Sequence, residues 1–162
     1  KYPIINREYY QLFSKRQRRY LEYTTIMVEG IKIHIMVTHL TLKKSNRIRE
    51  LQEIVQVFSH IKEPKILMGD FNTQDPEELS ILNNADLTSI NNEKTYPSWN
   101  PKQCLDHIYI SKEFKVIRGE TMQLRVSDHL GVMAELELSP QKKDKPIKKL
   151  KKKISGDKIR KR

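Results

Sequence analysis

One short stretch, residues 66–72 with the sequence Ile-Leu-Met-Gly-Asp-Phe-Asn, constrains the fold more than any other part of the chain. Its three leading apolar residues are typical of a short strand buried on both faces, and Gly69 lets other groups approach the backbone. The strand ends in a carboxylate, Asp70, and a carboxamide, Asn72, which an extended chain points to the same side. Because an unpaired buried carboxylate is costly, this pattern indicates a site, although a simple Asx-type turn explains the same letters.

Charge is distributed unevenly along the 162 residues, which carry a formal net charge of +11. Residues 142–162 hold 12 basic and 2 acidic side chains, so the remainder, with 19 basic and 18 acidic side chains, is nearly neutral. We expect one domain over residues 1–140 and a basic, disordered tail over residues 141–162, which cannot bury enough apolar surface to fold alone. The tail could bind nucleic acid or acidic lipid headgroups, or it could be only a solvated lysine-rich extension.

The chain has a single cysteine, Cys104, so it cannot form an internal disulfide, and this slightly favours a reducing, intracellular compartment. No apolar run approaches the roughly 20 residues of a membrane span, so we expect no transmembrane segment. No signal peptide is visible. The chain begins with Lys1 rather than methionine, and we therefore expect that an N-terminal part is missing.

A β-hairpin is expected over residues 21–28 and 31–40, with Glu29-Gly30 as its turn. The second strand alternates well: an apolar face carries Ile33, Ile35 and Val37, while His34, Met36 and Thr38 share the other face. That apolar face ends in a histidine, His39, at the C-terminal end of the strand. A histidine in this position is more often a structural residue than a catalytic one.

The remaining chain is expected to contain two helices and several short strands. A helix capped by Ser45 or Asn46 is expected to run to about residue 60, and a short helix is expected to begin at Asp75-Pro76. Residues 6–19 are expected to form a loop with some helical character. The further strands are expected over residues 1–5, 65–69, 105–111, 114–118, 122–126 and 131–138.

Four of the predicted strand ends carry polar residues of the types that bind hard cations or transfer protons. These residues are His39, Asp70 with Asn72, Asp106, and Asp128 with His129. One such strand end could be accidental, but four of them indicate a site for a hard cation and a general base. A zinc site is less favoured because the spacings match no compact zinc motif. The chain has neither a Gly-rich phosphate loop nor a Gly-x-Ser-x-Gly elbow.

Four segments, in their order and rough spacing, resemble the endonuclease/exonuclease/phosphatase superfamily. They are Thr38-His39-Leu40, Gly69-Asp70-Phe71-Asn72, Leu105-Asp106-His107-Ile108 and Ser127-Asp128-His129. The loop Thr95-Tyr96-Pro97-Ser98-Trp99 is also similar to members of this group of metal-dependent hydrolases. The resemblance runs over about residues 1–138 and implies an α/β (α+β) fold, the four-layered αββα sandwich of the deoxyribonuclease-I-like type. Only the C-terminal portion of that sandwich is expected here, without its N-terminal part.

The resemblance implies Mg²⁺-dependent hydrolysis of phosphodiester or phosphomonoester bonds, with Mn²⁺ as a substitute ion. By this resemblance, His39 would contact the scissile phosphate. Asp70 would orient or deprotonate the attacking water, and Asn72 would hold the phosphate or the water beside it. These roles suit the chemistry, because the reaction needs an activated water and neutralised phosphoryl oxygens.

The resemblance assigns the other polar residues as follows. Asp106 would fix and stabilise the imidazole of His129, which would stabilise charge on the phosphoryl oxygens or take part in proton transfer. Asp128 would help to hold the metal. Tyr96 and Trp99 could stack on a base or line a substrate cleft, although packing against their own domain is the commoner role of loop aromatics.

The chain departs from the family in one large respect. The family's first half, with an Asn-bearing strand and a metal-binding Glu, has no counterpart here, so a missing N-terminal half or a completing chain would have to supply these groups. The alternative is a catalytically incomplete half-domain that acts as a nucleic-acid-binding, anion-binding or partner-dependent module. A lone half would leave apolar surface exposed on the inner face of one sheet. The sequence does not select among DNA, RNA, phosphoinositides, sphingomyelin and small phosphoesters.

Overall fold

The computed structural model describes residues 1–14 and 17–139, and the predicted basic tail lies outside this range. Six strands form one mixed sheet, here called the large sheet. They are β1 (Ile4–Leu12), β2 (Arg19–Val28), β3 (Ile31–His39), β4 (Lys65–Asp70), β5 (Leu87–Ser89) and β6 (Asp106–Ser111), in the order β1-β2-β3-β4-β6-β5. Two further strands, β7 (Phe114–Thr121) and β8 (Val132–Leu138), pair with each other in a small sheet.

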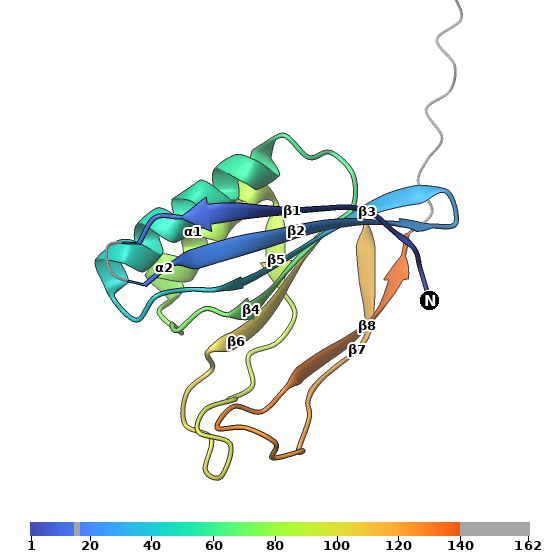
Figure 1. Cartoon of the computed structure of the whole chain (residues 1–162). Coiled ribbons are helices and arrows are strands. Elements are labelled where there is room, and N and C mark those ends of the chain that lie inside the picture. Colours follow the sequence, from blue (N-terminus) through green and yellow to red (C-terminus); the bar gives the residue numbers. More distant parts are fainter. Residues whose placement is uncertain (15–16, 140–162) are drawn as a thin grey trace, which may run out of the picture.

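Three layers are present in the part of the chain that the structure describes. The helices α1 (Lys44–Ser59) and α2 (Pro76–Leu79) and the 3₁₀ helix η1 (Ser80–Ala85) cover one face of the large sheet, and the small sheet approaches the other face (Figure 1). This arrangement confirms the predicted mixed α/β class and accounts for three layers of the expected sandwich. No helix among the described residues is long and apolar enough to span a bilayer.

The predicted hairpin is confirmed as β2 and β3, and both faces of β3 carry buried side chains. Met36 is fully buried in the core under the helices; on the other face Ile33 is buried, whereas Val37 is 39% exposed. The register explains this arrangement, because Met36 pairs with Leu67 of β4, and both belong to the core cluster that includes residues of α1. Alternation defines two faces but does not say which one the helices cover.

Two further expectations about strands are wrong. Residues 6–12 belong to β1 rather than to a loop, because their backbone pairs with β2 as far as Leu12 opposite Arg19. β1 lies at one edge of the large sheet. Residues 122–126 form no strand, because β7 extends to Thr121 and the chain then leaves the small sheet as a loop.

The two helices begin in different ways. The predicted start of α2 is confirmed: the Asp75 side chain accepts a hydrogen bond from Glu77 N at 2.9 Å, with Pro76 as the first helical residue. The predicted cap of α1 is wrong, because this helix begins after Lys43, which makes no side-chain capping bond. Its placement comes instead from packing, through the buried side chains of Leu51, Ile54 and Phe58.

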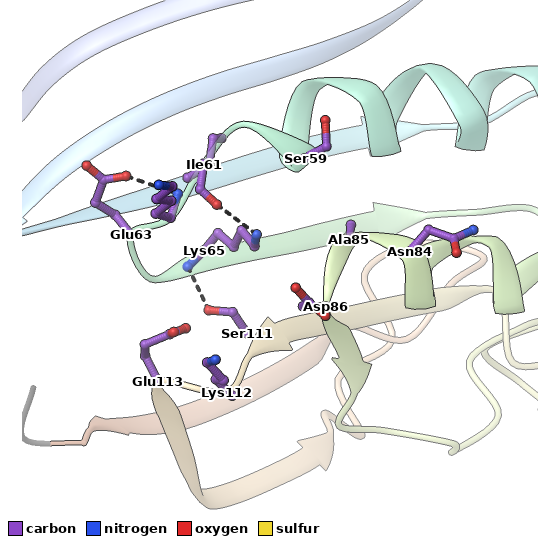
Figure 2. A pocket seen from close by; sticks show the side chains of 11 residues that line it. Ser59, Ile61, Glu63, Lys65, Asn84, Ala85, Asp86, Ser111, Lys112 and Glu113 are labelled. Carbon is purple, nitrogen blue, oxygen red and sulfur yellow. Dashed lines mark hydrogen bonds between the residues drawn. The ribbon is translucent and has the colours of Figure 1, made fainter.

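A buried lysine anchors the C-terminal end of α1. Lys65, the first residue of β4, donates from Nζ to the carbonyl oxygen of Ile61 at 2.9 Å (Figure 2). It also donates to the carbonyl oxygen of Phe58 at 3.4 Å. Its backbone N donates to Ser111 Oγ of β6 at 3.0 Å. A cation at this position interacts favourably with the carbonyl end of the helix dipole. The adjoining cavity of about 310 Å³ lies at the start of β4, the end opposite Asp70.

The face of the large sheet that points away from the helices is only partly covered. Phe114 and Leu136 of the small sheet approach Ile33 and Ile35 around a groove of about 480 Å³. Tyr9, Tyr20 and Val37, whose register places them on the same face, are exposed. The predicted exposure of apolar surface on this sheet is therefore confirmed.

The buried histidine His34 predicts a pH-dependent stability. Its Nδ1 is hydrogen-bonded to Tyr23 OH at 2.5 Å, and burial lowers its pKa, opposed by Glu63 and assisted by two nearby lysines. The unfolded chain therefore takes up this proton at a higher pH than the folded chain, so stability should fall as the pH drops below about 6.5. In urea melts, His34→Gln should show a smaller loss of unfolding free energy between pH ~7.5 and ~5.5 than the unmodified protein. An identical loss in the two proteins would contradict this assignment.

Candidate active site

The parallel pairing of β3 and β4 brings the first two predicted site residues together. His39 pairs with Asp70 at the C-terminal ends of these strands, and His39 Nε2 lies 3.3 Å from Asp70 Oδ2. Gly69 makes this close pairing possible: its φ is +140°, and a Cβ atom there would lie 1.9 Å from Thr38 O. Any other residue would push β4 away from β3 at this point.

Asn72 closes a turn directly after β4. Its φ is +51°, a left-handed conformation that asparagine tolerates better than most residues. Its backbone N donates to Asp70 Oδ1 at 2.8 Å, and its Nδ2 donates to Leu40 O at 2.8 Å. The Asx-type turn and the site are therefore the same structure, because the turn holds one oxygen of Asp70 and leaves the other facing His39.

The antiparallel pairing of β4 with β6 places Asp106 opposite Asp70. Asp106 Oδ2 lies 2.8 Å from His129 Nδ1, and His129 Nε2 lies 4.0 Å from Asp70 Oδ2. The Tyr96 ring packs on the other side of this imidazole, with ring centroids 4.8 Å apart. These contacts fix the orientation of His129 and turn its Nε2 toward Asp70.

The loops that carry the site hold one another through backbone hydrogen bonds. Thr95 Oγ1 accepts a bond from Asp106 N at 3.3 Å, and Thr95 O accepts one from Leu130 N at 2.8 Å. Ser98 N donates to Asp128 O at 2.7 Å. The segment around Thr95 therefore connects the start of β6 to the segment that carries His129.

Most of the predicted site residues line one cleft of about 570 Å³. The described residues that line it are Gln17, Arg19, His39, Leu42, Asp70, Asn72, Tyr96, Gln103, Leu105, Asp128 and His129. Asp106 contacts His129 and is not part of the cleft wall. Trp99 is not part of this wall, and 63% of it is exposed.

Arg19 is a site residue that the sequence did not reveal. It is the first residue of β2 and lines the cleft, and its Nη2 donates to Gln17 Oε1 at 3.0 Å. Its buried Nε makes no hydrogen bond within the described residues. Arg19 falls within the loop that was expected over residues 6–19. Had β2 been predicted to begin at Arg19, this cation would have been expected next to His39, the last residue of β3.

Opposing influences set the charge of the two histidines. Burial acts to lower the pKa of His129, but the hydrogen bond and charge of Asp106, together with the charges of Asp70 and Asp128, outweigh it and raise this pKa above its ordinary value. Burial lowers the pKa of His39; Asp70 opposes the shift, and the positive charge of Arg19 adds to it. His129 is therefore the histidine that more readily carries a proton in the cleft.

Several side chains in and next to the cleft carry atoms that could bind a cation. Asp70, Asp106 and His129 each offer one ligand atom, and these atoms lie within 4.8 Å of one another. Because Asp106 already binds His129, the oxygen donors on the cleft wall come from Asp70, Asn72 and Asp128. Mg²⁺ prefers oxygen donors and commonly uses one or two carboxylates, with water and substrate phosphate as the remaining ligands. The cleft wall therefore offers carboxylate and amide oxygens of the kind that Mg²⁺ prefers.

The chain matches known proteins in sequence and in structure. The model of the Endonuclease/Exonuclease/phosphatase family matches residues 4–129. A mannosyl-6-phosphatase of Bacteroides thetaiotaomicron VPI-5482 superposes with a TM-score of 0.72 at 17% identity, covering 85% of this chain and 68% of that one. The human Nocturnin catalytic domain, solved with bound sulfate, gives a TM-score of 0.67 at 21% identity, with coverages of 85% and 60%.

An endonuclease/exonuclease/phosphatase family protein from Leptotrichia buccalis C-1013-b superposes with a TM-score of 0.70 at 23% identity, covering 84% of this chain and 62% of that one. These likenesses establish a shared fold. The chain spans between 46% and 68% of the length of the structures it matches. No curated protein sequence matches it.

The contact between Asp106 and His129 predicts a change in the pKa of the histidine. Asp106→Asn keeps the shape of the side chain but removes its charge, so the pKa of His129 should fall. NMR titration of the histidine ring signals would measure this change, with the signals of the exposed His60 as the internal control. An unchanged or higher pKa for His129 would show that Asp106 does not control its charge.

Proposed function

This chain belongs to the endonuclease/exonuclease/phosphatase family, and we propose that it carries the general-base and phosphate-binding residues of a metal-dependent phosphoesterase. The observation that supports this most strongly is the convergence of three strand ends. At one end of the large sheet, Asp70 Oδ2 lies 3.3 Å from His39 Nε2 and 4.0 Å from His129 Nε2. The other ring nitrogen of His129, Nδ1, lies 2.8 Å from Asp106 Oδ2. Their arrangement suits an activated water beside a protonated imidazole.

A divalent cation fits the proposed reaction. Asp70, Asn72 and Asp128 would hold it, and we propose Mg²⁺ with Mn²⁺ as a substitute, because all three donors are oxygens. When bound, such an ion polarises a phosphoryl oxygen and neutralises part of the developing charge. Members of this family generally depend on divalent metals, and the Asp70–Asp106–His129 cluster agrees with that dependence.

The side chains of the cleft would provide the proton transfer and the phosphate contacts of the reaction. Asp70 Oδ2, directed between two imidazoles, would orient a water molecule and accept its proton as the oxygen attacks phosphorus. His129 binds Asp106 through Nδ1, so its Nε2–H is free to donate to a phosphoryl oxygen when the ring is protonated. His39, whose pKa is lowered, would contact the phosphate from the opposite side of Asp70.

The length of the matched structures raises the question of whether this chain holds every residue that hydrolysis requires. The matched structures are longer than this chain, so part of their fold has no counterpart in it. The same difference in length favours the second candidate, a binding module that holds phosphate without hydrolysing it. Turnover measurements separate the two functions, because binding alone produces no product.

The first test is hydrolysis of bis-p-nitrophenyl phosphate and p-nitrophenyl phosphate with Mg²⁺. Asp70→Asn and His129→Ala should each reduce kcat by about 10²–10⁴, because each removes a proton-transfer or charge-stabilising group. EDTA should abolish the reaction. The control is His60→Ala, which removes an exposed histidine at the end of α1. Phosphate binding without turnover by the unmodified protein would favour the binding module, and full activity of Asp70→Asn would contradict the proposed mechanism.

Arg19 provides a second test. The guanidinium on the cleft wall should bind a substrate phosphate oxygen, so Arg19→Ala should lower kcat/KM by about 10–100-fold, largely through KM. The matched control is Arg18→Ala, since Arg18 is exposed and does not line the cleft. An equal loss in the two variants would show that the effect comes from general charge rather than from the position of Arg19.

A further inference from the structure

Four exposed apolar side chains lie on three segments that contribute residues to the cleft. We call Leu42, Trp99, Leu124 and Val126 the apolar rim; they are 78%, 63%, 60% and 81% exposed. Single exposed apolar residues are ordinary on protein surfaces, but several at the mouth of one site indicate an interaction surface.

The members of the rim come from three segments that meet at the cleft. Leu42 is itself part of the cleft wall, in the connection between β3 and α1. Ser98, the neighbour of Trp99, donates to Ser127 O at 2.6 Å, and Ser127 is the neighbour of Val126. The loop before β6 and the loop between β7 and β8 accordingly lie side by side at one end of the molecule (Figure 1).

Positive charge accompanies the rim. Lys43 follows Leu42, Arg125 lies between Leu124 and Val126, and Lys102 belongs to the loop of Trp99. All three cations are exposed, and within the described residues none of them forms an ion pair. The loop segments 94–103 and 122–131 contain a single acid, Asp128, which lines the cleft. A binding partner of this surface must therefore present negative charge next to apolar material.

We propose that the apolar rim docks the mouth of the cleft onto an anionic lipid surface. Aliphatic side chains such as Leu124 and Val126 gain by entering hydrocarbon, tryptophan favours the headgroup level, and the cations attract anionic headgroups. A single-stranded nucleic acid fits less well, because it needs stacking platforms and Trp99 is the sole aromatic residue of the rim. This inference concerns where the cleft is placed and does not depend on the proposed hydrolysis.

The chain contains one tryptophan, and that residue is part of the rim, so the unmodified protein reports its own docking. Its emission should shift to shorter wavelength when vesicles of phosphatidylcholine and phosphatidylglycerol (about 7:3) are added, and brominated acyl chains should quench it. Vesicles of phosphatidylcholine alone should give a much weaker response, and added salt should weaken the response to anionic vesicles.

Paired variants separate the rim from the rest of the chain. The double variant Leu124→Gln/Val126→Gln should lower partitioning into the anionic vesicles by about tenfold or more, because it removes two aliphatic side chains that enter hydrocarbon. Its matched control is Ile4→Gln/Ile5→Gln, which alters two exposed apolar residues at the far end of β1 and should leave partitioning unchanged. The basic tail is present in all of these proteins.

Three outcomes would overturn the inference. The first is vesicle binding without a shift in tryptophan emission, or equal binding by the double variant, since either would assign attachment to another part of the chain. The second is quenching of Trp99 by single-stranded oligonucleotide but not by vesicles. The third is a buried-type emission spectrum in the protein as its native source makes it, since a protein partner would then cover the rim. Hydrolysis of the soluble p-nitrophenyl esters, measured on the same samples, tests the proposed function separately.

Discussion

The structure depends on the close approach of β3 and β4 at Gly69. With a Cβ atom at that position 1.9 Å from Thr38 O, no other residue allows the two backbones to pair to the ends of both strands. That pairing places His39 beside Asp70. On its other edge β4 pairs with β6, and there Asp106 lies opposite Asp70. One backbone constraint thus places three of the side chains that carry the proposed chemistry.

A second set of contacts fixes the segment that follows His39. The Arg47 guanidinium forms a bidentate pair with Glu78 of α2, at 2.8 Å and 2.9 Å, and also donates to the carbonyl oxygens of Thr41 and Leu42. Arg47 and Glu78 are both buried, where removal of one partner would leave an uncompensated charge. The segment after His39 is therefore fixed from two sides. The Arg47–Glu78 pair of the two helices holds it through the carbonyls of Thr41 and Leu42, and Asn72 holds it through the carbonyl of Leu40.

The sequence predicts the polar residues at the strand ends better than it predicts which face of a strand is buried or where the edge strand runs. Asp70, Asn72, Asp106 and His129 could be identified because their types and order are unusual at strand ends, and the structure brings them together. The deeper burial of Met36 than of Val37 could not, because alternation is symmetric between two faces and only the packing of α1 breaks that symmetry. Arg19 and residues 6–12 of β1 were missed for a related reason, since a polar edge strand has little apolar pattern to reveal it.

The orientation of the site is local, whereas its charge balance is not. Each hydrogen bond that orients Asp70, Asn72 and His129 comes from residues of the large sheet or its connecting loops, so this chain alone can present them in order. The charge of the site depends on more than these bonds, because the Asp106 hydrogen bond and the charges of Asp106, Asp70 and Asp128 outweigh burial and raise the pKa of His129. The alignment of the proposed catalytic side chains is therefore set by the residues that the structure describes.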